Sequence, residues 1–153
     1  MTIRAATPAD LAACAAMGVK FGQDVYAGKV PVDADTILAL GVRLLEQGTI
    51  LVADKENAPI GMLGLIILPH LFSGQPHCSE VFWWVDPEHR GCGIRLLRAG
   101  EAWAWDHGAT SMHVSAPDTR VGALYERLGY QKVETAYIRT PRMCENTHDL
   151  NRI

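Results

Sequence analysis

The 153-residue sequence has no run of basic residues, no apolar run of membrane-spanning length and no Cys-x-x-Cys pair. With a net charge of −3 and no basic block, the chain is not expected to have nucleic acid as its main partner. The longest apolar run, Met62 to Leu68, contains Gly64 and suits a buried strand, so no membrane partner is expected either. Met1 to Thr7 lacks the long apolar region of a signal peptide, and we therefore expect a cytoplasmic protein.

Cysteine is sparse, and its four positions are dispersed along the chain: Cys14, Cys78, Cys92 and Cys144. Unpaired, reduced thiols fit a cytosolic protein. Two places bring a histidine close to a cysteine, His77–Cys78 and His89–Cys92, but neither has the second pair of ligands that a zinc site needs. No metal is therefore expected.

The composition is that of a globular protein, with 48% hydrophobic and 20% charged residues. There is no repeat, no low-complexity segment and no linker. The length suits one domain with a substantial core. We expect this domain to span residues 1–141 and a polar tail to follow over residues 142–153.

The hydrophobic periodicity predicts an α/β (α+β) protein. Short early strands joined by a hairpin, followed by helical crossovers, indicate a mixed sheet covered by helices. Strands are expected at residues 2–6, 49–53, 60–68, 78–85, 111–116 and 130–140, the last as one or two strands. Helices are expected after Thr7-Pro8, around residues 37–44, from residue 96 to 107 and after Asp118.

The central stretch, Cys78 to Gly108, predicts a strand, a tight turn and a helix in succession. Its first part is aromatic and β-branched, which is typical of a strand. Pro87 cannot donate a ladder hydrogen bond, and Gly91 and Gly93 allow positive φ, so a turn follows. The helix after it has one apolar face, made of Leu96, Leu97, Gly100, Trp103 and Ala104.

This arrangement is typical of an anion site. The first N–H groups of a helix lack intrahelical partners and carry the positive end of the helix dipole. Glycines at positions 91 and 93 let a phosphate approach the backbone closely, and Arg90 adds a forked cation. The alternative is an ordinary connection in which the glycines only make the turn.

The segment Arg90-Gly91-Cys92-Gly93-Ile94-Arg95 resembles the Arg/Gln-x-x-Gly-x-Gly/Ala motif of the GNAT superfamily of N-acetyltransferases. Five of the six positions are compatible with that motif. The sixth, Arg95, departs from it, because the family has a small residue there that makes room for the pyrophosphate of acetyl-CoA. Arg95 either crowds that site or adds a cation to it. Helical spacing places it opposite Leu96 and Leu97, which favours a flanking or solvent-facing side chain.

The resemblance implies a mixed, mostly antiparallel central sheet of six to seven strands, covered by about four helices. It also implies two splayed central strands, residues 81–85 and 112–116, that receive the pantetheine arm, with a backbone N–H near Val85 polarising the thioester. No metal is implied. The coenzyme contacts expected from the resemblance are Trp84, Val85, Arg90, Gly91, Cys92, Gly93, Ile94, Arg95 and Asp118. Core packing is the alternative for the aromatic strand residues, since alternation sends Trp83 and Trp84 to opposite faces.

A second segment, from Asp118 to Tyr130, resembles the family's Asn-x-x-Ala-x-x-Leu-Tyr…Gly-Phe pattern. Asp118 replaces Asn and Val121 replaces Ala. The resemblance makes Tyr125 the general acid that protonates the departing thiolate, and a phenol with a pKa near 10 suits that role. The alternative is a tyrosine in the apolar stripe of an amphipathic helix.

The general base is less clear from the sequence. Glu80 lies on the central strand, where the family often supplies a carboxylate or a water relay, and alternation would place it with Phe82 and Trp84. Three histidines, at positions 70, 77 and 113, also titrate near neutrality. For each of these the alternative is a solvated side chain at the edge of the sheet.

The first functional hypothesis is an acetyl-CoA-dependent N-acetyltransferase acting on a primary amine of a small molecule or protein by direct attack. Its acceptor pocket would involve the Phe21–Pro31 and Leu68–His77 loops. The second is a non-catalytic acyl-CoA-binding or structural protein, similar to GNAT-like proteins of tailed phages; Arg95 and the missing clear base favour it. Trp105, on the outward helix face, marks either a homodimer contact or a site that the C-terminal tail covers.

Overall fold

The computed structural model describes residues 1–141, so the predicted tail, 142–153, lies outside the described residues together with Cys144. The chain divides into two compact units. The first is Met1–Ser115 and the second begins at Ala116. Each is described by itself.

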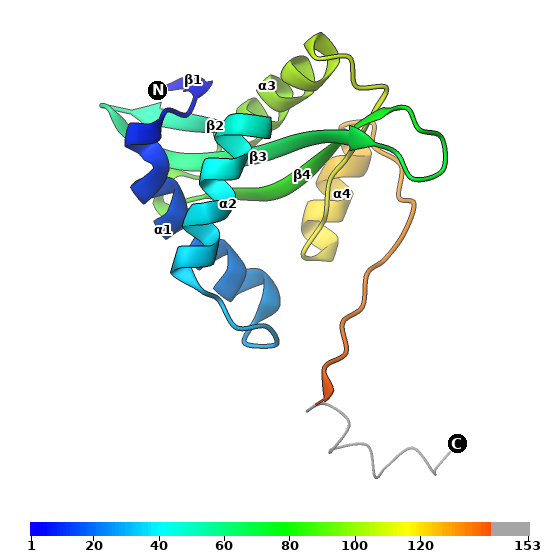
Figure 1. The fold of residues 1–153 in the computed structure, drawn as a ribbon, viewed down its shortest axis with the longest axis horizontal. Helices are drawn as coiled ribbons and strands as arrows, with labels where there is room; N and C mark the ends of the chain where they lie inside the picture. The colour runs from blue at the N-terminus through cyan, green and yellow to red at the C-terminus, as the bar shows by residue number, and fades with distance from the viewer. Residues whose placement is uncertain (142–153) are drawn as a thin grey trace. The chain divides into compact units, whose positions relative to one another are not determined.

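The first unit contains a five-stranded sheet in the order β1-β2-β3-β4-β5 (Figure 1). The first three pairings are antiparallel and the last, β4 with β5, is parallel. The mixed, mostly antiparallel sheet predicted from the sequence is therefore confirmed, but with five strands instead of six to seven. The strands are β1 (Thr2–Ala5), β2 (Gly48–Lys55), β3 (Ala58–Pro69), β4 (Pro76–Val85) and β5 (Ser111–His113).

The missing strands are the ones that were predicted over residues 130–140, and β5 also ends three residues before the predicted Ala116. Residues 130–140 form no strand. Val133 and Tyr137 are 75% and 94% exposed. The apolar and β-branched residues that suggested a strand favour one only where a neighbouring surface buries them, and this segment lacks that burial.

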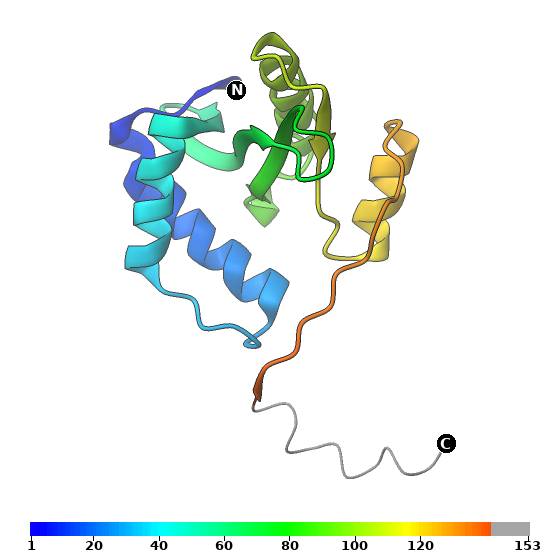
Figure 2. The ribbon, with the colours of Figure 1, turned by 45° about the vertical axis from the view of Figure 1, so that its right-hand side comes forward.

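Residues 1–141 contain four α-helices, as the sequence predicted. In the first unit, α1 and α2 cover one face of the sheet and α3 covers the other (Figures 1 and 2). The second unit contains α4. The helices are α1 (Leu11–Tyr26), α2 (Ala34–Gln47), α3 (Gly93–Asp106) and α4 (Thr119–Arg127), with short 3-10 turns η1 (Pro8–Asp10) and η2 (Pro87–His89).

Each face of the sheet has its own hydrophobic core, and strand alternation divides the residues between them. Ile50 and Val52 of β2 point to the helices α1 and α2, while Leu51 and Ala53 point to α3. The same alternation buries Met62 on one side of β3 and Leu63 and Leu65 on the other. Burial of this strand on both faces, predicted from its continuous apolar run, is therefore confirmed.

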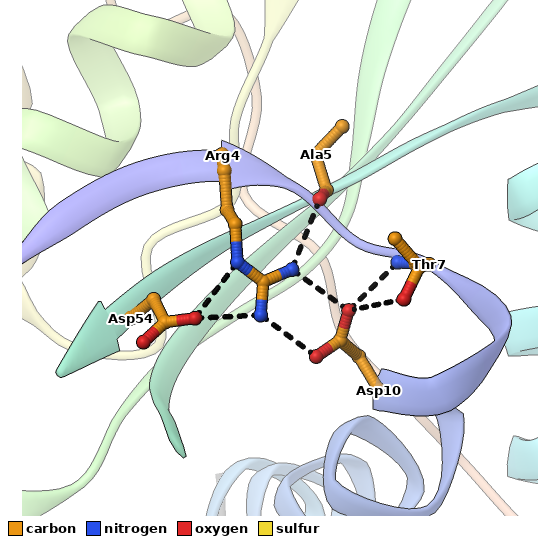
Figure 3. A network of polar contacts seen from close by, with 5 residues as sticks. All are labelled: Arg4, Ala5, Thr7, Asp10 and Asp54. Carbon is orange, nitrogen blue, oxygen red and sulfur yellow. Dashed lines mark hydrogen bonds and ion pairs between the residues drawn. The ribbon is translucent and has the colours of Figure 1, made fainter. Parts of the chain in front are cut away.

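The guanidinium of Arg4 on β1 links this strand to η1 and to β2 (Figure 3). Arg4 Nε donates to Asp54 Oδ2 at 2.7 Å, and its Nη1 and Nη2 donate to the two oxygens of Asp10 at 2.8 and 2.9 Å. Thr7 N–H donates to the same Asp10 carboxylate at 2.7 Å. These bonds, above all those from Arg4, hold the pKa of Asp10 well below its usual range. The network ties β1, η1 and β2 together.

Candidate functional site

The predicted strand–turn–helix stands at the centre of the first unit. β4 ends at Val85, η2 follows and α3 begins at Gly93. The turn is anchored to the neighbouring strand, because Asp86 N–H donates to Ile60 C=O at 3.0 Å. The start of α3 is therefore positioned directly by the central strands.

The N-terminus of α3 has no side-chain cap, which sets it apart from α2 and α4. Asp33 accepts from Thr36 N–H at the start of α2, and Asp118 accepts from Val121 N–H at the start of α4, both at 2.8 Å. Cys92, the residue before α3, makes no such bond. The first-turn amides of α3, with the positive end of the helix dipole, are therefore suited to an anionic ligand.

The two glycines of the motif serve different purposes. Gly91 has φ +111°, and a Cβ at this position would meet nothing within 4 Å, so the space beside its backbone is open. Gly93 has no positive φ; a Cβ there would lie 3.0 Å from Trp83 Cζ2. Gly91 therefore adopts the positive φ that a glycine allows, whereas Gly93 does not and is small because an indole packs against it.

The side chains around the motif divide into exposed and buried ones as the helical spacing predicted. Arg90 and Arg95 are exposed, and Ile94 is 43% exposed. Leu96 and Leu97 are fully buried. Cys92 is buried too, and burial raises the pKa of its thiol, which disfavours a nucleophilic thiolate. Two exposed guanidinium groups therefore accompany the uncapped helix end.

Lys20 of α1 and Asp86 form a salt bridge beside the turn that the sequence did not suggest. Lys20 Nζ lies 2.9 Å from Asp86 Oδ1, and the same oxygen accepts the Trp84 indole N–H at 3.0 Å. Burial alone would raise the pKa of Asp86, but these two hydrogen bonds together lower it. Only the position of Asp86 between the strand and Pro87 could have suggested this anchor. Nothing in the spacing pointed to Lys20.

A polar hollow of about 230 Å³ lies beside this ion pair, lined by Lys20, Asp86, Pro87, Glu88 and His89. His89 Nδ1 is buried there with no hydrogen-bond partner among the described residues. In the sequence, His89 stands out only as one half of an incomplete zinc motif with Cys92. In residues 1–141 no group of three or more His, Cys, Asp or Glu side chains is arranged to hold a metal ion.

A β-bulge in β4 corrects the predicted orientation of Glu80. Gly64 pairs with Phe82 and Leu65 pairs with Glu80, which leaves Val81 as the extra residue. Phe82 and Trp84 pack into the core under α1 and α2, whereas Leu65, the partner of Glu80, belongs to the α3-side core. Glu80 therefore does not share a face with Phe82 and Trp84, because the bulge shifts the alternation between them. Trp83 and Trp84 do lie on opposite faces, as predicted.

The parallel ladder between β4 and β5 is short. It pairs His77 with Ser111, Cys78 with Met112 and Ser79 with His113, whereas β4 continues to Val85. Just beyond the last pair, the Glu80 carboxylate accepts the Ser115 N–H at 3.0 Å. Two central strands that stop pairing partway agree with the splayed arrangement predicted for them.

The remaining predicted site residues lie in the second unit. Asp118 is the N-cap of α4, as the sequence predicted, so its carboxylate already has a structural partner. Tyr125 is buried on α4, and its ring lies 5.5 Å from that of Tyr130. The coenzyme contact predicted for Asp118 and the acid role predicted for Tyr125 stay predictions.

A family model described as the acetyltransferase (GNAT) family matches residues 26–130 of the chain. No curated protein sequence matches this chain. Within the described residues, no helix is both long enough and apolar enough to cross a membrane.

Solved structures share the fold. Aminoglycoside 6'-N-acetyltransferase AAC(6')-IG from Acinetobacter haemolyticus superposes with a TM-score of 0.70 at 22% identity, covering 92% of this chain and 97% of that one. A ribosomal-protein-alanine N-acetyltransferase from Brucella melitensis gives 0.69 at 17% identity, covering 92% and 99%. The aminoglycoside N-acetyltransferase AAC(6')-Iy in complex with CoA gives 0.71 at 21% identity, covering 92% and 94%. At these identities the likeness is one of fold.

Proposed function

Because this chain belongs to the acetyltransferase (GNAT) family, we propose that it transfers the acetyl group of acetyl-CoA to a primary amine by direct attack. The observation that carries the proposal is the start of α3. Its first turn has no side-chain cap, and the space beside Gly91 is open. An anionic diphosphate fits there, because the backbone amides and the helix dipole favour negative charge.

The residues present fit the coenzyme. The amides of residues 91–95 would hold its diphosphate, and the exposed Arg90 and Arg95 would add positive charge. The pantetheine arm would follow β4 near Trp84 and Val85, where a backbone N–H would polarise the thioester carbonyl. The coenzyme supplies an activated acetyl group, and the chain supplies its position and orientation.

Tyr125 is proposed as the general acid for the thiolate. Its identity rests on the match of the α4 segment to the family pattern, and a phenol is well matched to a thiol leaving group. Asp118 would contact the coenzyme and at the same time cap the N-terminus of α4. Glu80 remains the carboxylate predicted as a base, and its bond to Ser115 N–H supports a second role, holding residue 115 beside β4.

Titration calorimetry with acetyl-CoA tests the coenzyme proposal directly. Binding in the micromolar range is expected, and no heat of binding at millimolar ligand would overturn it. A thiol-release assay then follows over a panel of amines. Because the similar folds include proteins described as aminoglycoside and ribosomal-protein-alanine N-acetyltransferases, the panel includes aminoglycosides and peptides with an N-terminal alanine.

Tyr125→Phe tests the acid. The variant keeps the ring but removes the proton, so kcat is expected to fall at least about 100-fold while the affinity for acetyl-CoA stays near that of the wild type. Unchanged turnover would refute the acid role.

The second candidate function, a non-catalytic protein that only binds acyl-CoA, is supported by Arg95 at the small-residue position. Calorimetric binding without thiol release over the whole panel would favour it.

A further inference from the structure

Three imidazoles from three separate segments contact one another in the first unit. The ring centroids of His77 and His113 lie 4.2 Å apart, those of His70 and His77 5.2 Å, and those of His70 and His113 6.0 Å. His70 comes from the hairpin between β3 and β4, His77 from β4 and His113 from β5. The cluster therefore joins the hairpin to the last two strands of the sheet.

His77 is the buried centre of this cluster. It is 7% exposed, whereas His70 is half-buried and His113 is exposed. Its Nδ1 lies 3.0 Å from Ser111 Oγ, and its Nε2 lies 3.0 Å from Ser79 Oγ. Both ring nitrogens therefore have hydroxyl partners, and the three imidazoles meet through their rings. Neutral rings pack together in this way, but protonated rings repel one another.

His70 also shapes the turn of the hairpin. Its backbone N–H donates to Gln75 C=O, and its C=O accepts the Gly74 N–H, both at 2.8 Å. Its ring Nδ1 accepts the Phe72 N–H at 3.3 Å. A ring nitrogen can accept a hydrogen bond only when it carries no proton. The bond from Phe72 is therefore lost when the His70 ring becomes a cation.

The strand that the cluster holds, β5, has few other attachments to β4. Two of its three register pairs with β4 contain a histidine of the cluster. Just before the ladder, Thr110 donates its N–H and its hydroxyl to Pro76 C=O at 2.8 and 3.0 Å. Because cross-strand side-chain pairs contribute much of the stability of a ladder, a strand this short depends on them strongly. Repulsion between the imidazoles acts directly on this pairing.

The charge of the cluster changes close to neutral pH. Imidazoles take up protons as the pH falls from about 8 to about 5. Burial above all, together with the nearby His113 and His70, lowers the pKa of His77. An opened segment takes up this proton near pH 6.5, whereas the closed one does so only at a lower pH. The stabilisation is therefore fully present above about pH 6.5 and is lost as the pH falls through the lower folded value.

The surroundings of His77 offer it no compensating charge. Within residues 1–141, the titratable groups that act on it are His113 of β5 and His70 of the hairpin. Its partner on β3 is the apolar Leu68. On α1 and α2, which cover the same sheet face, Lys20 is bonded to Asp86 and the other charged side chains are exposed. The Glu80 carboxylate of β4 accepts the Ser115 N–H.

We propose that His70, His77 and His113 form an acid-sensitive latch that holds β5 and the β3–β4 hairpin against β4 at neutral pH and releases them in mild acid. Protons from water bind the imidazoles, the charged rings separate, and the short ladder opens. Because β4 and β5 stop pairing just beyond the cluster, release widens the space between these strands. The latch needs only the protein and protons, so it does not depend on the proposed acetyl transfer.

Amide hydrogen exchange on the protein alone tests the latch. Protection factors, which are corrected for the intrinsic pH dependence of exchange, are compared at pH 7.5 and pH 5.5. The amides of β5 and the N–H groups of Gly74 and Thr110 are expected to lose about tenfold in protection, the equivalent of one pKa unit. The amides of β2 are expected to keep theirs. Unchanged protection of β5, or an equal loss in β2, would overturn the latch.

Three variants show whether the histidines cause the loss. His77→Gln keeps a side chain that can bond to hydroxyls but cannot take up a proton, so its β5 protection should be the same at both pH values. His113→Gln, at an exposed position, removes the nearest charge and should reduce the loss, which keeps the test available if His77→Gln does not fold. His107→Gln is the matched control, because His107 stacks on Trp103 at the end of α3, and it should retain the tenfold loss. A full wild-type loss in folded His77→Gln or in His113→Gln would contradict the latch.

Discussion

The indole of Trp83 lies against the backbone of Gly93, so that a Cβ at residue 93 would sit 3.0 Å from Trp83 Cζ2. This packing joins the central strand to the first turn of α3. It explains why the second glycine of the motif, Gly93, has to be small, and this explanation does not depend on any ligand. The strand and the helix start are therefore positioned as one piece.

Gly93→Val is expected to lower the free energy of unfolding by about 1–3 kcal/mol, because the added side chain has to displace the indole. Trp83→Phe shortens the ring at the contact and should recover part of that loss in the double variant. Chemical denaturation of the four proteins in the cycle measures the coupling. Strictly additive effects would show that the two residues do not interact.

Asp86 accepts hydrogen bonds from Lys20 and from the Trp84 indole. Replacing Lys20 should therefore cost less stability than replacing Asp86 itself. Lys20→Met breaks an ion pair whose lysine side chain is 53% exposed, so the expected cost is below about 1 kcal/mol. Asp86→Ala also leaves the half-buried Trp84 indole N–H without its acceptor, which is expected to cost about 1–3 kcal/mol. Urea denaturation compares the two variants, and equal losses would refute the distinction.

The Arg4–Asp10 pair predicts a dependence of stability on acid. The pKa of Asp10 is lowered in the folded state, chiefly by hydrogen bonds from Arg4, so its stabilisation is fully present above the unfolded value of about 4 and is lost as the pH falls through the lower folded value. Asp10→Asn should destabilise the protein at pH 7 by about 1–3 kcal/mol and reduce its loss of stability below pH 4. Thermal unfolding from pH 7 to pH 2 measures both, with the exposed Asp24→Asn as the control. Parallel curves for wild type and Asp10→Asn would contradict the assignment.

Arg95 is exposed, and its variants decide whether it helps or hinders an anion. We expect Arg95→Gly to weaken acetyl-CoA binding severalfold, since it removes a cation near the uncapped start of α3. Arg95→Glu should weaken binding further, and the difference should shrink at high salt. Calorimetry at two salt concentrations measures both effects. Tighter binding by Arg95→Gly would mean that the side chain obstructs the site.

Glu80 has two candidate roles that two variants separate. Glu80→Gln keeps an oxygen that can accept the Ser115 N–H but loses the charge needed by a base, whereas Glu80→Ala loses both. If Glu80 mainly holds residue 115, kcat should be nearly unchanged in Glu80→Gln and clearly lowered in Glu80→Ala. The thiol-release assay makes the comparison. A loss of about 100-fold in Glu80→Gln would instead support the general base predicted from the sequence.

Local features of the site could be predicted because neighbours in the sequence determine them. Aromatic and β-branched residues made the β4 strand recognisable, Pro87 marked the turn, and helical spacing placed Arg95 away from Leu96 and Leu97. Even the N-cap at Asp118 follows from the residue type and its position. The strand predicted over residues 130–140 was wrong, since a strand also depends on a partner and on burial.

The sequence by itself determined the order of the elements as far as α4, the glycine turn and the helix that follows it, because each depends on interactions within a few residues. Only the tertiary structure decided which side of the sheet Glu80 occupies, that Lys20 reaches Asp86, and that three histidines meet. The physical reason is strand register. One extra residue at Val81 shifts the alternation along β4, and contacts between distant segments follow from pairings that no local pattern records.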